Sequence, residues 1–317
     1  MAAKEMRAVY AETLAGLAAS DPRIVLLEAD LMRASGTASF KERYPERLFD
    51  LGVAEANMVG VAAGLAAEGK IPFAASFGCF ASRRVFDQFF VSCAYARLGV
   101  KLVGTDPGVT AAYNGGTHMP FEDLGLMREV PGLDIVEPSD PLSLAALIRE
   151  LAARPGPAYL RLHRKAVEPL YAEGESFEVG KAKLLREGGD LCIVALGALM
   201  VRNSLRAAEL LAAEGIAASV IDALSLKPLD AALVLAEARR SGAVLSAENH
   251  QVAGGLGSAL AELLAETGAA RLARVGVRDE FGEVGTQEYL VERFGLRAED
   301  IAQAARRLLA AKVKENA

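Results

Sequence analysis

Tryptophan is absent from this 317-residue sequence, and cysteine and histidine are scarce, with three of each. The scattered cysteines have neither the even number of a disulfide framework nor the spacing of metal ligands. Three dispersed histidines argue against a multi-histidine zinc site. These six residues are Cys79, Cys93, Cys192, His118, His163 and His250. The sequence therefore predicts no metal site within this chain.

Long apolar runs are also missing, because glycine or charge interrupts each one, and this argues against a membrane-spanning helix. The segment Met1–Arg7 lacks the basic-then-apolar pattern of a secretory signal. Lysine and arginine are dispersed and outnumbered by acids, 35 to 41, which gives a net charge of −6 and argues against a nucleic-acid partner. We therefore expect a cytoplasmic protein with no membrane or nucleic-acid partner.

Apolar, strand-like runs alternate with helical patterns along almost the whole chain. This alternation predicts an α/β protein of two domains, each a mostly parallel sheet flanked by helices. We expect domains over residues 1–165 and 190–317, joined by a linker over 166–189 that is rich in proline, glycine and charge. Helices are expected over 55–67 and 84–98, and a long polar loop over 105–120.

Glu55 stands where a predicted strand, Leu48–Gly52, meets a predicted helix. An acid in the first turn of a helix interacts favourably with the positive end of the helix dipole, so Glu55 has an ordinary structural explanation. Its position, where a strand meets a helix, also makes it a candidate functional residue.

An aromatic and charged run follows, with Phe77 and Phe80 in a turn and Arg84 on the next helix. One interpretation is a pair of core aromatics plus an ion pair within the helix between Arg84 and Asp87. The other is an aromatic platform for a flat heterocycle, supported by polar side chains.

The loop Thr105–Asp123 contains several glycines, Asn114 and His118. A lone histidine is more often structural than catalytic. This one, however, is in a polar loop after a strand, where open α/β sheets place their ligands, and that position favours a functional role.

Three motifs in this order resemble the transketolase family: Gly-Val-Ala-Glu at 52–55, Phe-x-x-Phe-x-x-x-Arg-x-x-Asp-Gln at 77–88 and Gly-Gly-Thr-His at 115–118. The segment Ala247–Gly257 resembles the signature of that family's C-terminal domain. The resemblance covers nearly the whole chain. It implies a pyrimidine-binding domain followed by a transketolase C-terminal domain.

The resemblance implies thiamine diphosphate as cofactor, with its pyrimidine side in this chain. Glu55 matches the glutamate that hydrogen-bonds the pyrimidine and promotes deprotonation of the thiazolium carbon. Phe80 matches the ring that stacks on the pyrimidine, with Phe77 beside it and Arg84 in support. His118 matches a histidine that contacts the transferred two-carbon unit. The remaining substrate-side positions implied by the resemblance are Arg7, Ser35, Asp106, Asn114 and Arg164.

Members of this family bind the diphosphate and its Mg²⁺ through a Gly-Asp-Gly element, which this sequence lacks; Gly188-Gly189-Asp190 has the wrong order. The resemblance therefore implies a separate N-terminal transketolase subunit that carries this element and holds Mg²⁺. It also implies self-association in a two-plus-two heterotetramer.

Two departures from the family pattern concern the substrate. Asp106 stands where a second phosphate-side histidine is usual, and Asn114 replaces an acid that contacts the donor's hydroxyl. A carboxylate repels a phosphate dianion, so we expect an unusual sugar or a different way of binding the phosphate of a sugar phosphate. Three alternatives remain open from the sequence: the β subunit of a 2-oxo-acid dehydrogenase, a 1-deoxyxylulose-phosphate synthase fragment, and a catalytically silent assembly paralogue.

Overall fold

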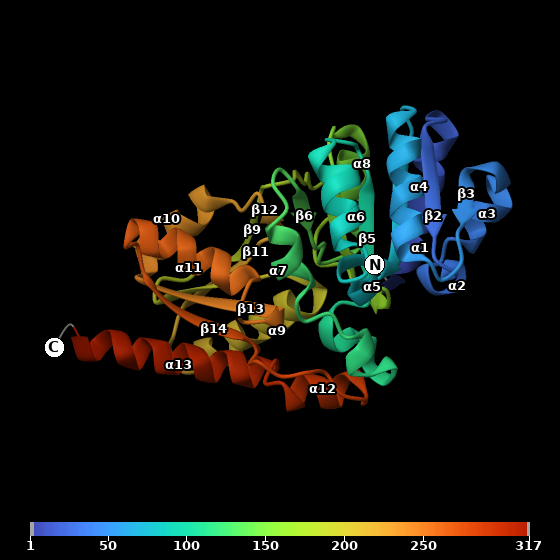
Figure 1. Cartoon of the computed structure of the whole chain (residues 1–317). Helices are drawn as coiled ribbons and strands as arrows, with labels where there is room; N and C mark the ends of the chain where they lie inside the picture. Colours follow the sequence, from blue (N-terminus) through green and yellow to red (C-terminus); the bar gives the residue numbers. More distant parts are fainter. Residues whose placement is uncertain (1–2, 316–317) are drawn as a thin grey trace.

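The computed structural model describes residues 3–315 of the chain, with side chains up to residue 312. It consists of two α/β units side by side, each built on its own sheet (Figure 1). The first sheet has the strand order β12-β6-β7-β5-β4-β2-β3. These strands are β2 Ile24–Glu28, β3 Leu48–Asp50, β4 Ile71–Phe77, β5 Lys101–Thr105, β6 Asp134–Val136, β7 Ala158–Leu162 and β12 Ser225–Lys227. All pairs are parallel except β12 with β6.

The second sheet has the order β14-β13-β10-β11-β9 and is parallel except for its edge strand β9. Its strands are β9 Lys183–Arg186, β10 Leu191–Ala195, β11 Ala218–Asp222, β13 Ala243–Gln251 and β14 Arg271–Val277. Central strands such as β5, β7 and β10 are buried at every residue, as expected where helices cover both faces of a parallel sheet. The predicted fold class is confirmed.

Helices cover the faces of both sheets (Figure 1). The first unit has α1 Met6–Ser20, α2 Met32–Ser35, α3 Ala38–Arg43, α4 Glu55–Ala67, α5 Gly78–Ser82, α6 Phe86–Gln88, α7 Asp123–Arg128 and α8 Pro141–Ala153. The second has α9 Gly197–Ala212, α10 Ala231–Ser241, α11 Leu256–Thr267, α12 Gln287–Arg293 and α13 Ala298–Glu315. No helix within residues 3–315 is long and apolar enough to cross a membrane.

The predicted helix over 55–67 is α4, with the same bounds. The predicted helix over 84–98 is replaced by the short α6, which continues as a π-helix over Phe89–Tyr95. The wider turn leaves Phe89 and Cys93 fully buried while Val91 and Tyr95 face solvent.

Short strands connect the two units. Within the predicted linker, β8, Ala166–Val167, pairs with the N-terminal β1, Lys4–Glu5, and β9 joins the second sheet. In the other direction, β12 leaves the second unit to extend the edge of the first sheet. The side chain of Lys227 on β12 donates to the carbonyls of Arg128 and Val130, at 2.8 and 2.7 Å. The second unit thus contributes a strand, β12, to the sheet of the first, which helps to fix their relative orientation.

Candidate active site

The predicted site residues gather at the carboxyl ends of the parallel strands of the first sheet. Glu55 begins α4 after β3, Phe77 ends β4, and His118 is in the loop after β5. Arg164 follows the end of β7. Parallel α/β sheets place their ligands at this edge, so the topology brings together residues that are far apart in the sequence.

The Glu55 carboxylate is buried, with 3% of the side chain exposed. It accepts a hydrogen bond from the Ser76 hydroxyl at 3.3 Å. The Arg84 guanidinium lies across it, with Nη1 at 3.1 Å from both carboxylate oxygens. Glu55 is therefore a helix-start acid, and it is also the centre of a polar cluster.

Arg84 connects this carboxylate to an aromatic surface. Its Cζ atom lies 3.8 Å from the centroid of the Phe80 ring. The ion pair expected within the helix with Asp87 is replaced by the pair with Glu55, 29 positions earlier. The Arg84 guanidinium is thus a planar group that donates N–H hydrogen bonds to Glu55 and lies over the Phe80 ring. The Arg84 side chain is about half exposed.

Phe77, Phe80 and His118 form one aromatic cluster. The ring centroids of the two phenylalanines are 6.2 Å apart, and that of His118 lies 5.8 Å from Phe77 and 5.1 Å from Phe80. The histidine ring meets both in edge-on geometry, a favourable arrangement for aromatic pairs. The Thr117 hydroxyl lies 2.9 Å from His118 Nδ1, which leaves Nε2 for another partner.

Two hollows adjoin this cluster. One of about 420 Å³ is lined by Cys79, Phe80, Arg83, Arg84, Thr117 and His118. The other, about 640 Å³, is lined by Val53, Ala54, Glu55, Ala56, Asn57 and Arg84. Arg84 lines both, so the two hollows lie on either side of its side chain. A larger hollow of about 890 Å³, around Tyr95 and Pro131, contains none of the predicted site residues.

A second group, centred on Asp106, lies next to Phe77. Asp106 is 1% exposed and accepts from Arg164 Nε at 3.1 Å, with Nη2 at 3.0 Å. Burial raises the pKa of Asp106, and the charge of Arg164 opposes that rise. The Arg164 guanidinium carbon also lies 5.7 Å from the Phe77 centroid. Asp106 and Arg164 therefore border the aromatic cluster as a pair.

Arg7 is the third charged residue near this group. Its backbone N–H donates to the Arg164 carbonyl at 3.2 Å, while its side chain pairs with Glu5 at 2.8 Å. Both arginines that we predict as anion contacts are thus already paired with a carboxylate.

Two predicted residues lie apart from the clusters. The Ser35 hydroxyl is buried and donates to Glu28 Oε1 at 2.6 Å, as does Thr37. Burial raises the pKa of Glu28 to about 7. Asn114 is exposed at the end of a 3₁₀ helix, η3, Gly108–Asn114. The Ser35 hydroxyl is thus occupied by its hydrogen bond to Glu28. Asn114 is exposed to solvent on the same loop as His118.

The loop that carries Asp106 and His118 has an unusual backbone. Four of its residues have φ between 49° and 78°: Asp106, Gly108, Ala112 and Gly115. For residues other than glycine, such conformations cost about 1–3 kcal/mol each and persist only where surrounding contacts hold them. The surrounding structure must therefore supply those contacts.

Asn249 of the second unit supplies two of them. Its side-chain amide donates to the Pro107 carbonyl at 2.8 Å, and its Oδ1 accepts from the Val109 N–H at 3.0 Å. All of these atoms are buried. Sequence reasoning assigned Asn249 only to a domain signature. The sequence carries no local signal for this contact, because the burial of Asn249 depends on the full length of β13, and only a buried amide needs such partners.

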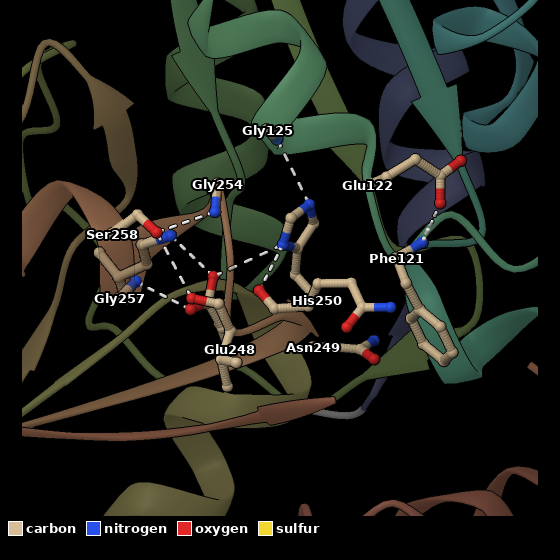
Figure 2. Close-up of polar contacts among 12 residues, drawn as sticks. Phe121, Glu122, Gly125, Glu248, Asn249, His250, Gly254, Gly257 and Ser258 are labelled. Carbon is tan, nitrogen blue, oxygen red and sulfur yellow. Dashed lines mark hydrogen bonds and ion pairs between the residues drawn. The ribbon is translucent and has the colours of Figure 1, made fainter. Parts of the chain in front are cut away.

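The residues on either side of Asn249 bind other elements (Figure 2). Glu248 accepts from the backbone N–H groups of Leu256 and Gly257, at 2.7 and 2.8 Å, at the start of α11. His250 Nε2 accepts from the Gly125 N–H at 3.3 Å, and Nδ1 lies 2.7 Å from the Gln251 carbonyl. This geometry requires a neutral ring, and burial lowers the pKa of His250 to about 4.

A buried arginine completes the contact between the units. Arg161 is 1% exposed and pairs with Asp123 at 2.8 Å and Glu137 at 3.0 Å. It also donates to the carbonyls of Pro120 and Asn249, at 3.1 and 3.0 Å. One cation thus contacts the loop, the first sheet and β13 together.

Comparison with known proteins agrees with this architecture. The family model "Transketolase, pyrimidine binding domain" matches residues 2–169, and "Transketolase, C-terminal domain" matches 180–301. The chain is 53% identical, over 95% of its length and 93% of the relative, to the 6-deoxy-6-sulfo-D-fructose transketolase subunit SqwH of Clostridium sp. strain MSTE9. It is 40% identical to a putative transketolase C-terminal section of Methanocaldococcus jannaschii, over 95% of each chain.

Among solved structures, the chain is similar to one described as "Split gene transketolase, inactive beta4 tetramer". The TM-score is 0.90 and the identity 43%, covering 96% of this chain and 98% of that chain. In extent, the chain thus corresponds to the C-terminal subunit of a split transketolase. Two family models and relatives of matching length show that this chain belongs to the transketolase family of transferases.

Proposed function

We propose that this chain is the pyrimidine-side subunit of a thiamine-diphosphate-dependent transketolase that moves a two-carbon ketol unit between sugars with a terminal anionic group. The observation that carries the proposal is the buried Glu55 carboxylate beside the Phe80 ring, with the Arg84 guanidinium between them. A guanidinium is planar and donates N–H bonds, as an aminopyrimidine does. The site therefore has the chemistry to stack and hydrogen-bond the cofactor's pyrimidine ring.

Bound thiamine diphosphate supplies a carbon nucleophile for the transfer. Glu55 would hold a proton shared with a pyrimidine nitrogen, and Phe80 would stack on the ring. Arg84, which is about half exposed, would turn outward to make room. His118 would contact the transferred unit through Nε2, because its ring packs against Phe80 and the residue lines a hollow.

The diphosphate and Mg²⁺ would be held by a second subunit that carries the Gly-Asp-Gly element. Among the side chains that the structure describes, residues 3–312, no group of three or more acidic, histidine or cysteine residues is placed to hold a metal ion. The solved neighbour is described as an inactive β4 tetramer, which supports self-association of such a subunit and a need for a different partner. We propose a two-plus-two assembly in the cytoplasm, which binds neither membrane nor nucleic acid.

The charges around Asp106 favour a substrate with a single negative charge. Arg164 and Arg7 are each paired with a carboxylate, so the net charge of these four side chains is close to zero. A phosphate carries about −1.5 to −2 charges at pH 7, whereas a sulfonate carries a single charge. Since the relative of 53% identity is described as a 6-deoxy-6-sulfo-D-fructose transketolase subunit, we propose a sulfonated ketose as donor.

The first test is to co-purify the chain with its partner and assay two-carbon transfer from sulfonated ketoses, ketose phosphates and 2-oxo acids. We expect transfer from a ketose that requires both subunits, thiamine diphosphate and Mg²⁺. Glu55→Gln should lower kcat/KM by at least about a hundredfold, the scale of a positioned acid–base group. Glu68→Gln, an exposed acid at the other end of α4, is the matched control and should behave as wild type.

The other outcomes separate the alternatives. Turnover of 2-oxo acids alone would indicate the β subunit of a dehydrogenase or a 1-deoxyxylulose-phosphate synthase fragment. Absence of cofactor binding by the assembled pair would indicate the silent paralogue. Full activity in Glu55→Gln would mean that Glu55 only starts the helix.

A further inference from the structure

We propose that Asn249 is a positioning residue: from the second domain, it holds the loop 106–118 in the conformation that presents Asp106 and His118 to the substrate. This inference rests on the proposed function, which names the reaction. The contacts of Asn249 with the loop do not depend on which reaction the site performs. It gives the second domain a part in the active site as well as in assembly.

The first support is the match between the contacts and the unusual backbone. Asp106, Gly108 and Ala112 have φ values of 57°, 49° and 49°. Asn249 binds the carbonyl of residue 107 and the N–H of residue 109, on either side of Gly108. A side chain at position 108 would place its Cβ atom 2.1 Å from Asn249 Oδ1. Asn249 therefore contacts the loop on both sides of a residue with positive φ, and the Asn249 side chain leaves room only for glycine there.

The second support is that Asn249 itself is fixed. Its backbone carbonyl accepts from the buried Arg161, and its neighbour in the sequence, His250, accepts from the N–H of Gly125 on α7 (Figure 2). Glu248, on its other side, binds the start of α11. A side chain anchored on both sides along β13 has little freedom, so it transmits the position of the second domain to the loop.

The far end of the loop also rests on the second domain. A Cβ atom at Gly116 would lie 2.0 Å from the Gly282 carbonyl oxygen, and one at Gly282 would lie 2.5 Å from Met119 Sδ. The two backbones are therefore in direct contact beside His118. With Asn249 near one end and Gly282 near the other, the loop is held between two points of the second domain. On the side of the first domain, Asp106 of the loop pairs with Arg164, and His118 packs against Phe80.

The test compares Asn249→Ala with Lys227→Met in the full chain and in the assembled enzyme. Lys227 is a matched control, because its side chain also makes two hydrogen bonds to backbone atoms across the domain contact, but to residues 128 and 130 and not to the loop. The first readout is hydrogen–deuterium exchange of the peptide covering 105–118. The second is kcat and KM for two-carbon transfer.

We expect Asn249→Ala to speed exchange in residues 105–118 by at least tenfold and to lower kcat by at least tenfold. Thiamine diphosphate affinity should change less than threefold, because Glu55 and Phe80 lie outside the loop. Lys227→Met should leave both loop exchange and kcat near wild type. Equal effects of the two variants would overturn the proposal, since Asn249 would then be an ordinary domain contact.

Asn249→Ser covers the case in which the alanine variant does not fold. Its hydroxyl is polar but too short to reach both loop atoms, so the same loss of loop protection and of kcat is expected. Unchanged loop exchange in this variant would also overturn the proposal. If the wild-type assembly showed no two-carbon transfer while exchange still separated Asn249→Ala from Lys227→Met, the proposed reaction would be wrong and the positioning role would stand.

Discussion

Asp106 is the side chain on which our proposal for the substrate depends most. From the sequence alone it is an acid in a place where the family resemblance implies a positive or neutral group. The structure adds that it is buried and paired with Arg164, and that burial raises its pKa. The carboxylate therefore neutralises much of the positive charge of Arg164.

Removing that carboxylate should change the selectivity for the terminal anion. In Asp106→Asn the shape is nearly kept, while Arg164 loses its charged partner and becomes available to the substrate. We expect the ratio of kcat/KM for a ketose phosphate over the matching sulfonated ketose to rise at least tenfold, which corresponds to about 1.4 kcal/mol. Competition between the two donors in one assay measures this ratio directly.

The control for this change is Glu209→Gln, which removes a charge from the exposed face of α9 in the second domain. It should leave the ratio unchanged. A fall in activity with both donors, in equal proportion, would instead show that Asp106 supports the loop and does not select the anion.

At the scale of elements, close approaches between the units depend on glycines at the ends of helices. Gly197 begins α9 with φ of 81°. A Cβ atom there would lie 2.1 Å from the buried Glu137 Oε1, and Glu137 pairs with Arg161. The start of α9 therefore packs directly on the charged centre of the domain contact.

Gly197→Ala should be markedly more destabilising than Gly69→Ala, its matched control. Gly69 has φ of 80°, but a Cβ atom added there would meet no other atom within 4 Å, so alanine has only the left-handed conformation to bear, about 1–2 kcal/mol. At Gly197 a clash in a packed interior adds about 1–3 kcal/mol. Urea denaturation of the two variants measures the difference. Equal losses of unfolding free energy would mean that α9 and Glu137 can shift apart at little cost to make room for the added methyl group.

Most elements of the fold could be predicted from the sequence because their signal is local. The helix over 55–67 follows from apolar periodicity and length, and it has the predicted bounds. The π-helix at Phe89–Tyr95 and the full length of β13 could not be predicted, because they depend on packing against other elements.

The candidate site, like the fold, has a part that the sequence predicts and a part that it does not. Glu55, Phe77, Phe80, Arg84 and His118 were predicted, and the structure brings them together at one edge of the sheet. The pair of Arg84 with Glu55 joins residues 29 positions apart. The hydrogen bond of Asn249 to the loop at Pro107 joins residues 142 positions apart. Only the tertiary fold sets such pairings.

At the scale of the whole molecule, large apolar side chains remain exposed around the candidate site. Val53 flanks Glu55 and is 71% exposed. Tyr113 on the loop and Val284, which lies beside Gly115, are 71% and 67% exposed, and Phe281 is 96% exposed. Exposed apolar groups gathered near a site that is open to solvent are typical of a surface that another subunit covers. We therefore expect the partner that completes the cofactor site to contact these residues.

Phe281→Ser tests that contact. Because the Phe281 ring is almost fully exposed, its loss should leave the Tm of the isolated chain within about 1 °C of wild type, as for surface substitutions in general. Burying such a ring under a partner contributes about 1.5–3 kcal/mol, so the Kd for the second subunit should rise by about tenfold to a hundredfold. Titration of labelled chain with the partner measures the Kd. Leu184→Ser, at the 37%-exposed position on the edge strand β9, is the control and should keep the wild-type Kd. A Kd for Phe281→Ser that matches this control would place the partner on another face of the molecule.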